Sequence, residues 1–313
     1  VAGNDLRSLA AIADLQLAKS ANYRVSFVFR DTPDDLRFDN LELEIGANQV
    51  KGNVSLGRSL HARRMNIAIS AGRLNIDELI RLLPAEQGAS PQSASKGVET
   101  VFSATPLPLD ALEGLDLSVK FVGKEVQIDR LPIRSLSFWL QVRDGGVQVD
   151  PINAHLAGGR IDGRINGAEP AFSASIDVQD AQLRPVLEGF QVTDLVDGRF
   201  NAKVDLSGRG TSIREIMGNL GGKTELIVDG AEVKGRYLDL LATDLVREIF
   251  PWSKRPDDTP IKCLVSRFNI TDGVAVADGM LLETDQMAIT GGGKINLRNE
   301  TLDLRLNPRS KKA

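Results

Sequence analysis

The residue types that most often carry catalysis are scarce in this sequence. It contains two histidines, His61 and His155, and one cysteine, Cys263. Histidine is the usual general base, but no G-x-S-x-G turn is present to place a serine nucleophile beside either one. His155 lies in an alternating stretch, INAHLAG, which is typical of a position on the surface of a sheet. Cys263 has no partner for a disulfide, and its context, IKCLVSRFNI, favours a small core residue. We therefore predict no catalytic residue.

Metal and phosphate sites are equally poorly supported. One cysteine and two distant histidines do not give the ligand spacing of a metal cluster. The acidic pairs at 34–35 and 257–258 stand beside prolines and are expected to be solvated loop carboxylates. The glycine clusters at 221–222 and 291–293 lack the Lys-Ser/Thr of a phosphate loop and are expected to be structural. The sequence thus predicts no metal and no cofactor.

Length and charge restrict the class of protein further. The 313 residues exceed one ordinary domain but could form one large β structure. With 38 basic and 42 acidic residues and only 5% aromatic residues, the chain has no basic, aromatic-rich stripe, so nucleic acid is not expected as a partner. No stretch approaches the roughly 18 apolar residues of a membrane-spanning helix. The polar opening, without an initiator methionine, suggests a piece of a longer protein.

Alternation of apolar and polar residues is the dominant pattern, and it predicts strands with one apolar face. It is clearest in four runs: Leu136, Phe138, Leu140 and Val142; Phe200, Ala202, Val204 and Leu206; Ile295 and Leu297; and Leu302, Leu304 and Leu306. Asp-Gly and Gly-Gly turns separate the runs, which predicts an antiparallel meander rather than βαβ units. Residues 38–54 and 149–165 form a weak repeat, with a third copy at 275–297.

A few short helices are expected to interrupt this sheet. The candidates are residues 74–83, with Asn75 or Asp77 near the start, 180–190, 211–220, with Thr211 and Ser212 as caps, and 237–250. The last should cover one edge or mouth of the sheet. A polar Ser/Ala/Gln stretch marks one boundary, so we divide the chain into a β segment with a short helix at 1–85, a linker at 86–98 and a β-rich region at 99–313.

Several segments in order resemble the AsmA family. TVFSATPLPLDAL at 100–112 resembles its "F-S-x-x-P-L-P-L-x-x-L" stretch, and LAGGRIDGRI at 156–165 resembles the return of its repeated sheet unit. Residues 261–306 are similar to its C-terminal signature, from CLVSRFNITDG to LDLRL. The resemblance covers about residues 100–308, and the preceding residues more loosely.

This resemblance implies a periplasmic protein that is anchored to the bacterial inner membrane by an N-terminal helix outside this sequence. It also implies a role in outer-membrane biogenesis, with relatives that move phospholipid between membranes through an apolar groove. The matched positions are strand and turn residues, so the resemblance implies no catalytic residue.

Two interpretations of the sheet stay open at this stage. The expected fold is mainly β, a long antiparallel, curled and repeated sheet with a few short helices, and it could be an open groove or sandwich-like, because both need the same alternation. In the first case phospholipid acyl chains are the partner, and the expected groove residues are Leu136, Phe138, Leu140, Val142, Val204, Leu206, Leu302, Leu304 and Leu306. In the second case the chain is a protein-binding scaffold that affects the assembly or targeting of outer-membrane proteins. A secreted enzyme is the third and weakest candidate.

Overall fold

A computed structural model describes residues 2–7, 17–58, 63–82, 101–107, 112–168, 170–190, 196–233 and 259–311. Strands make up 73% of the described chain, which confirms the mainly β prediction. The chain divides into a first unit, residues 1–101 and 108–155, and a second unit, residues 102–107 and 156–313. The expected linker at 86–98 and the expected helix at 237–250 lie outside the described residues.

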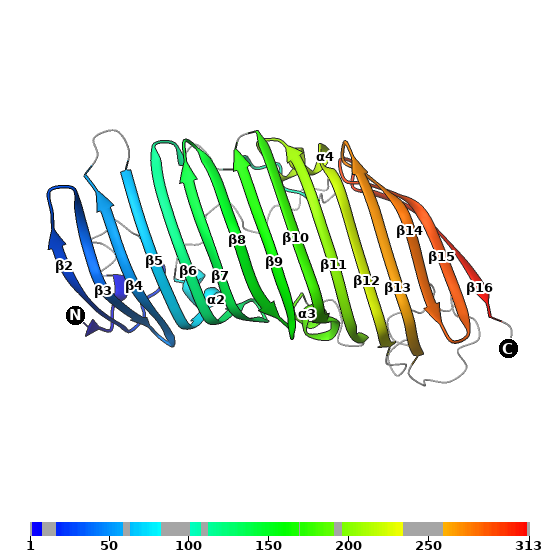
Figure 1. Ribbon diagram of the computed structural model, residues 1–313, viewed down its shortest axis with the longest axis horizontal. Helices are drawn as coiled ribbons and strands as arrows, with labels where there is room; N and C mark the ends of the chain where they lie inside the picture. Colours follow the sequence, from blue (N-terminus) through cyan, green and yellow to red (C-terminus); the bar gives the residue numbers. More distant parts are fainter. Residues whose placement is uncertain are drawn as a thin grey trace. The chain divides into compact units, whose positions relative to one another are not determined.

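The first unit is one sheet in which the strands follow one another in chain order (Figure 1). Its strands are β1 (Ala2–Gly3), β2 (Tyr23–Asp31), β3 (Asp35–Ile45), β4 (Asn48–Gly57), β5 (Arg63–Asn75), β6 (Leu115–Ile128), β7 (Leu131–Arg143) and β8 (Gly146–Leu156). One pair departs from the expected meander, because β5 and β6 are parallel. The chain between them contains α2 (Ile76–Ile80) and has to return to the starting end of β5, as a parallel connection requires.

The second unit also keeps chain order, and its described strand pairs are all antiparallel. Its strands are β9 (Gly159–Ala168), β10 (Ala171–Gln182), β11 (Val196–Arg209), β12 (Gly221–Val233), β13 (Thr259–Thr271), β14 (Val274–Thr284), β15 (Met287–Asn296) and β16 (Thr301–Ser310). In neither unit do the first and last strands pair, so each sheet is open. The prediction of a long antiparallel sheet with a few short helices is confirmed apart from the parallel pair β5 and β6.

The helices expected at 74–83, 180–190 and 211–220 are each shorter than the sequence predicted, and the first and the last have a side-chain cap where the residue type indicates. Asn75 caps α2 by accepting a hydrogen bond from the Glu78 N–H at 3.0 Å. Helix α4 (Ile213–Gly218) is capped in the same way by Ser212, and α3 (Leu183–Gly189) begins after Gln182 without a side-chain cap. In the second unit, α3 and α4 lie at opposite ends of the strands (Figure 1).

Two β-bulges are stabilised in the same way, by an asparagine side chain of the next strand. Asn40 and Asp180 have positive φ angles of 51° and 54°, and the sheet register shifts at each of them. The backbone N–H of Asn40 donates to the Asn53 side chain, and that of Asp180 donates to the Asn201 side chain, both at 3.0 Å. Each bulge therefore inserts a residue while the next strand satisfies the freed N–H, so the apolar side chains on both sides of the bulge face the same way.

Candidate functional site

The second unit has an apolar face that can be traced residue by residue through its register. Paired residues in neighbouring strands lie on the same face. One row across six strands, from β11 to β16, is formed by Leu206, Gly222, Ile270, Ala275, Ile295 and Leu302. A second row, through the middle of the strands β10 to β12, consists of Ile176, Val204 and Thr224. We call this surface the apolar face of the second unit.

The first unit has an apolar face of the same kind. One of its rows runs from β2 to β7 through Phe29, Phe38, Val54, Ile67, Val119 and Leu140. A neighbouring row contains Leu41, Gly52, Ile69, Phe121 and Phe138, and the rings of Phe121 and Phe138 stack with centroids 5.1 Å apart. Phe27 and Phe29 on β2 pack against Phe38, with distances between ring centroids of 5.3 and 5.4 Å.

In the described part of the chain, short helices cover the ends of these faces. In the first unit, Ile76 and Leu79 of α2 pack on a buried cluster of Ala71, Leu74 and Val126. In the second unit, α3 packs on one cluster (Ala181, Phe200, Val228 and Ala231) and α4 on another (Leu220, Ile270 and Ala275). The central residues Phe138, Leu140 and Val204 belong to none of these clusters and are half-buried. Within the described ranges, no second sheet lies over them.

The nine groove residues expected from the sequence all lie on the apolar face of their own unit, but in different surroundings. Leu136 packs against the cluster under α2, and Leu206 against the cluster under α4. Val142 is buried, with 2% of its surface exposed. The other six are half-buried or exposed: Phe138, Leu140, Val204, Leu304, Leu302 at 67% and Leu306 at 47%. The register therefore brings the set onto the apolar faces, where Leu136 and Leu206 have helix-covered neighbours although they are themselves half-buried.

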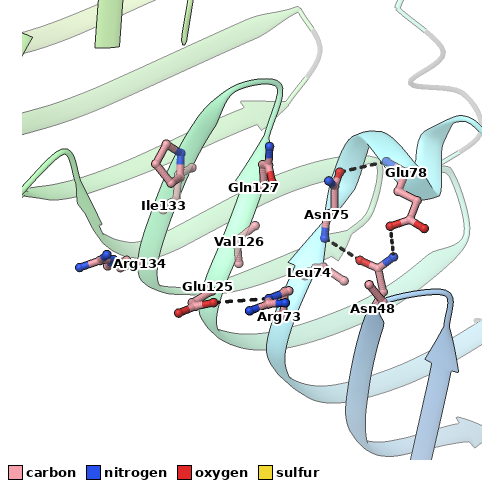
Figure 2. A pocket seen from close by; sticks show the side chains of 12 residues that line it. Asn48, Arg73, Leu74, Asn75, Glu78, Glu125, Val126, Gln127, Ile133 and Arg134 are labelled. Carbon is pink, nitrogen blue, oxygen red and sulfur yellow. Dashed lines mark hydrogen bonds and ion pairs between the residues drawn. The ribbon is translucent and has the colours of Figure 1, made fainter. Parts of the chain in front are cut away.

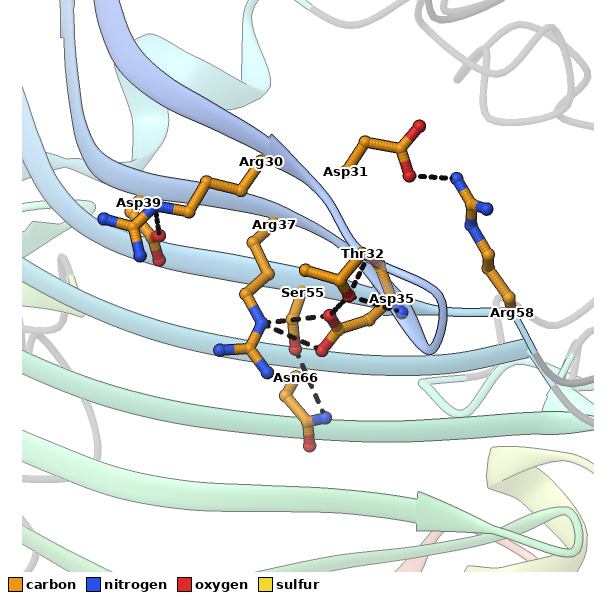
Figure 3. Close-up of polar contacts among 9 residues, drawn as sticks. All are labelled: Arg30, Asp31, Thr32, Asp35, Arg37, Asp39, Ser55, Arg58 and Asn66. Atoms are coloured by element: carbon orange, nitrogen blue, oxygen red, sulfur yellow. Dashed lines mark hydrogen bonds and ion pairs between the residues drawn. The ribbon is translucent and has the colours of Figure 1, made fainter.

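The opposite face of the first unit carries paired charges. Arg37 Nε lies 2.9 Å from Asp35 Oδ1, and Arg30 Nε lies 3.3 Å from Asp39 Oδ2 (Figure 3). A third pair, Arg58 with Asp31, is at the ends of the strands on the side of the apolar face, because Asp31 is opposite Leu36. The Arg37 guanidinium, with help from the Thr32 hydroxyl, lowers the pKa of the Asp35 carboxyl. Because these exposed arginines already have acidic partners, this group of charges is a solvated surface and not an anion site.

A pocket of about 300 Å³ in the first unit is held together by a buried asparagine (Figure 2). Asn48, 2% exposed, donates to Glu78 Oε2 at 3.0 Å and to the Ile45 carbonyl at 3.1 Å. It also accepts the Asn75 N–H at 2.6 Å. The pocket's charged row, Arg73, Glu125 and Arg134, is exposed, with Arg73 and Glu125 paired at 3.6 Å. The Asn48 contacts join the β3–β4 turn to α2, which is a structural role.

The FSATPL part of the sequence motif forms a strap, Phe102–Leu107, that belongs to the second unit. The Leu107 N–H donates to the Thr211 carbonyl at 2.8 Å, and the Arg214 N–H donates to the Ser103 carbonyl at 3.0 Å. The Phe102 N–H donates to Glu300 Oε1 at 3.0 Å. The strap thus ties the start of α4 to the turn between β15 and β16, a contact that sequence periodicity does not reveal.

Among the residues that the structure describes, the side chains with catalytic potential are not gathered into a site. His155 is exposed on β8, and His61 lies outside the described residues. The expectation that Cys263 is a core residue was wrong: it pairs with Asp229 and Glu283 on the polar face of the sheet and is only half-buried. Partial burial, with these two carboxylates, raises the pKa of its thiol. No group of three or more His, Cys, Asp or Glu residues that could hold a metal occurs in the part of the chain that the structure describes.

Comparison with known proteins places the sequence in a family. The sequence model of the AsmA family matches residues 83–278, more than half of the chain. The chain belongs to the AsmA family. The AsmA family protein YhjG of Escherichia coli (strain K12) is 22% identical over 283 residues, which cover 85% of this chain and 41% of YhjG. This AsmA-family chain therefore spans about two fifths of that relative. No solved structure matches it.

Among the described residues, no helix combines the length and the hydropathy needed to cross a bilayer.

Proposed function

We propose that this AsmA-family chain is a non-enzymatic periplasmic segment, in a protein anchored to the inner membrane, that binds or conducts phospholipid acyl chains along its apolar faces. In this proposal the full-length protein serves outer-membrane biogenesis. The observation that carries the proposal is the half-buried centre of each face, represented by Phe138, Leu140 and Val204. A side chain in the middle of a closed sandwich would be fully buried, whereas these retain exposed apolar surface.

The physical reason for lipid as the ligand is the shape and chemistry of that surface. Each face is apolar across several strands and carries no charged residue in its central rows. Each acyl methylene removed from water contributes about 0.8 kcal/mol, so about five methylenes laid along one face would contribute about 4 kcal/mol. A contact of this kind needs no hydrogen-bond donor or acceptor, so it suits acyl chains better than a polar solute.

The test is to secrete the chain into the bacterial periplasm, purify it without detergent, and measure extracted lipid by mass spectrometry per mole of folded protein. The proposal expects phospholipid to co-purify and to be displaced by a fluorescent fatty acid. A folded chain with neither bound lipid nor fatty-acid uptake would contradict it and would favour the protein-binding scaffold.

We further propose that no histidine acts chemically in this role. His155 is exposed, and no acidic or nucleophilic side chain is hydrogen-bonded to it in the described structure. Replacing His61 and His155 together by Gln in the full-length protein should leave its envelope phenotype intact. Loss of that phenotype at unchanged protein abundance would overturn the non-enzymatic assignment.

A further inference from the structure

The last strand of the second unit, β16, presents an open edge. It pairs with β15 over ten residues, from Thr301 to Ser310, and no described strand pairs with its other side. A long edge with unpaired N–H and C=O groups is a template for another strand, and proteins usually shorten it or cover it. Here Pro308 protects only the last part of the strand, whereas the first part carries exposed leucines, with Leu302 at 67% and Leu306 at 47%. The composition of this edge therefore indicates a strand partner.

The sequence of β16 is nearly self-complementary about Leu304. Reading outwards from that residue, Asp303 and Arg305 have opposite charges, and Leu302 and Leu306 are identical. In an antiparallel pair of two copies centred on Leu304, each Asp303 faces an Arg305 and each Leu302 faces a Leu306. The register thus places two opposite-charge pairs on one face and three leucine pairs on the other.

The neighbouring registers lack this match. Centring the pair on Asp303 or on Arg305 would set two like charges directly opposite each other, which destabilises a sheet. Moving the centre by one residue slides one strand two residues past the other, and this replaces two attractive pairs by a repulsive one. A slip of a single residue sets Asp303 opposite a leucine and also loses both attractive pairs. The pattern therefore selects one register as well as one partner.

The charges themselves are available for such a contact. Neither Asp303 nor Arg305 forms an ion pair within the described chain. Within the sheet, Arg305 stands opposite Gly292, which offers no side chain to bind it, and Asp303 stands opposite Lys294 without forming an ion pair with it. The leucines, which are opposite Ile295, Gly293 and Gly291, lie on the apolar face of the second unit. Pairing would therefore extend that face from one copy into the next.

We propose that β16 is a homodimerisation edge, at which two copies of this chain pair antiparallel about a two-fold axis through Leu304. The axis is perpendicular to the sheet, so the apolar faces of the two copies lie on the same side. The interface is isologous and closed, because each β16 pairs with the β16 of the other copy and neither edge remains unpaired. Pro308 lacks an N–H but lies beyond the five-residue centre of the contact.

Charge-swap variants test the register through the oligomeric state. We would measure the monomer–dimer equilibrium of the 313-residue chain by analytical ultracentrifugation over a wide concentration range. Arg305→Asp sets Asp303 against an acidic residue twice in each dimer and should weaken dimerisation about tenfold or more. Adding Asp303→Arg reverses both members of each pair and should restore it. Circular dichroism of each variant monitors the fold of the monomer.

Crosslinking tests the same register without a change of charge. In a Cys263→Ser background, Leu304→Cys places two thiols opposite each other, with Cβ atoms about 5 Å apart. Leu302→Cys alone leaves its two thiols four residues apart along the strands, about 13 Å. A crosslinker too short for the second distance should link Leu304→Cys and not Leu302→Cys, and should link a mixture of Leu302→Cys with Leu306→Cys.

Three results would overturn the proposal. The first is a monomer at every concentration with no Leu304→Cys crosslink. The second is equal crosslinking of Leu302→Cys and Leu304→Cys. The third is a dimer whose stability is the same with Arg305→Asp and with the double swap, since that dimer would be formed by another surface.

Discussion

Replacing Leu140 by Asp separates an open apolar face from a closed core more sharply than other single changes. Leu140 lies on the apolar face of the first unit, opposite Val119, and it is half-buried outside the cluster that α2 covers. A carboxylate at this position can keep part of its hydration shell. A carboxylate at a fully enclosed position cannot, and it costs several kcal/mol or becomes protonated.

The magnitudes follow from that geometry. For folding, the loss of a partly buried leucine should reduce the free energy of unfolding by about 1–2 kcal/mol. For lipid binding, a carboxylate that keeps about two acyl methylenes in water removes about 1.6 kcal/mol, which weakens binding roughly fifteenfold. We therefore expect Leu140→Asp to fold and to lose most of its lipid.

The assay combines urea unfolding, followed by circular dichroism, with displacement of a fluorescent fatty acid. The matched control is Gln141→Asp, which adds the same charge one residue along β7, on the polar face opposite Ser118. It should leave both stability and binding close to those of the parent chain. Leu206→Asp is the contrasting variant, because Leu206 packs under α4 and should lose much more stability.

Two outcomes would refute this reasoning. If Leu140→Asp unfolds the chain as completely as Leu206→Asp, the face around Leu140 is an ordinary core. If Leu140→Asp folds and binds fatty acid as tightly as Gln141→Asp, acyl chains do not contact this face.

Three further predictions concern stability. Gly293→Ala should destabilise the second unit by several kcal/mol, because φ is +135° and a Cβ there would lie 2.1 Å from a backbone oxygen of β16. The control Gly292→Ala should be tolerated, because a Cβ at that position has nothing within 4 Å. Thermal unfolding of the two variants tests the difference. Asn48→Leu should cost about 1–3 kcal/mol in urea unfolding, since it leaves buried polar partners unsatisfied, and no loss would exclude a structural role for the pocket. The hydrogen bond from Lys311 lowers the pKa of Glu283 below its ordinary 4.5. The stability from this pair is therefore present above pH 4.5 and is lost as the pH falls through the lowered pKa. Lys311→Met should flatten the curve of stability against pH in this acidic range, and an unchanged curve would contradict the pairing.

Much of the sheet could be predicted because its determinants are local. Alternation along β7 and β16 placed each leucine on one face before any partner strand was known, and the turn residues separated the strands. Asn75 and Ser212 likewise act as helix caps because a side-chain oxygen next to a free N–H is a short-range contact.

The same local signals could not give the exceptions. The parallel pairing of β5 with β6 depends on where the chain re-enters the sheet after α2, which periodicity does not encode. The bulges at Asn40 and Asp180 depend on an asparagine in the next strand. The apolar stretch around Cys263 predicted a core position. Alternate residues of β13 point to opposite faces, however, and Cys263 is on the polar face beside Asp229 and Glu283.

Tertiary structure decided which apolar residues are covered. Leu136, Leu140, Leu206 and Leu302 have the same place in the alternating pattern, so the sequence by itself determines only that each faces the apolar side of its sheet. Leu136, Leu140 and Leu206 are all half-buried, but only Leu136 and Leu206 pack against clusters that α2 and α4 cover, and Leu302 is exposed on an edge strand. The direction of a side chain is set by its own strand, whereas its cover comes from elements distant in the chain, and only the packed structure brings these together.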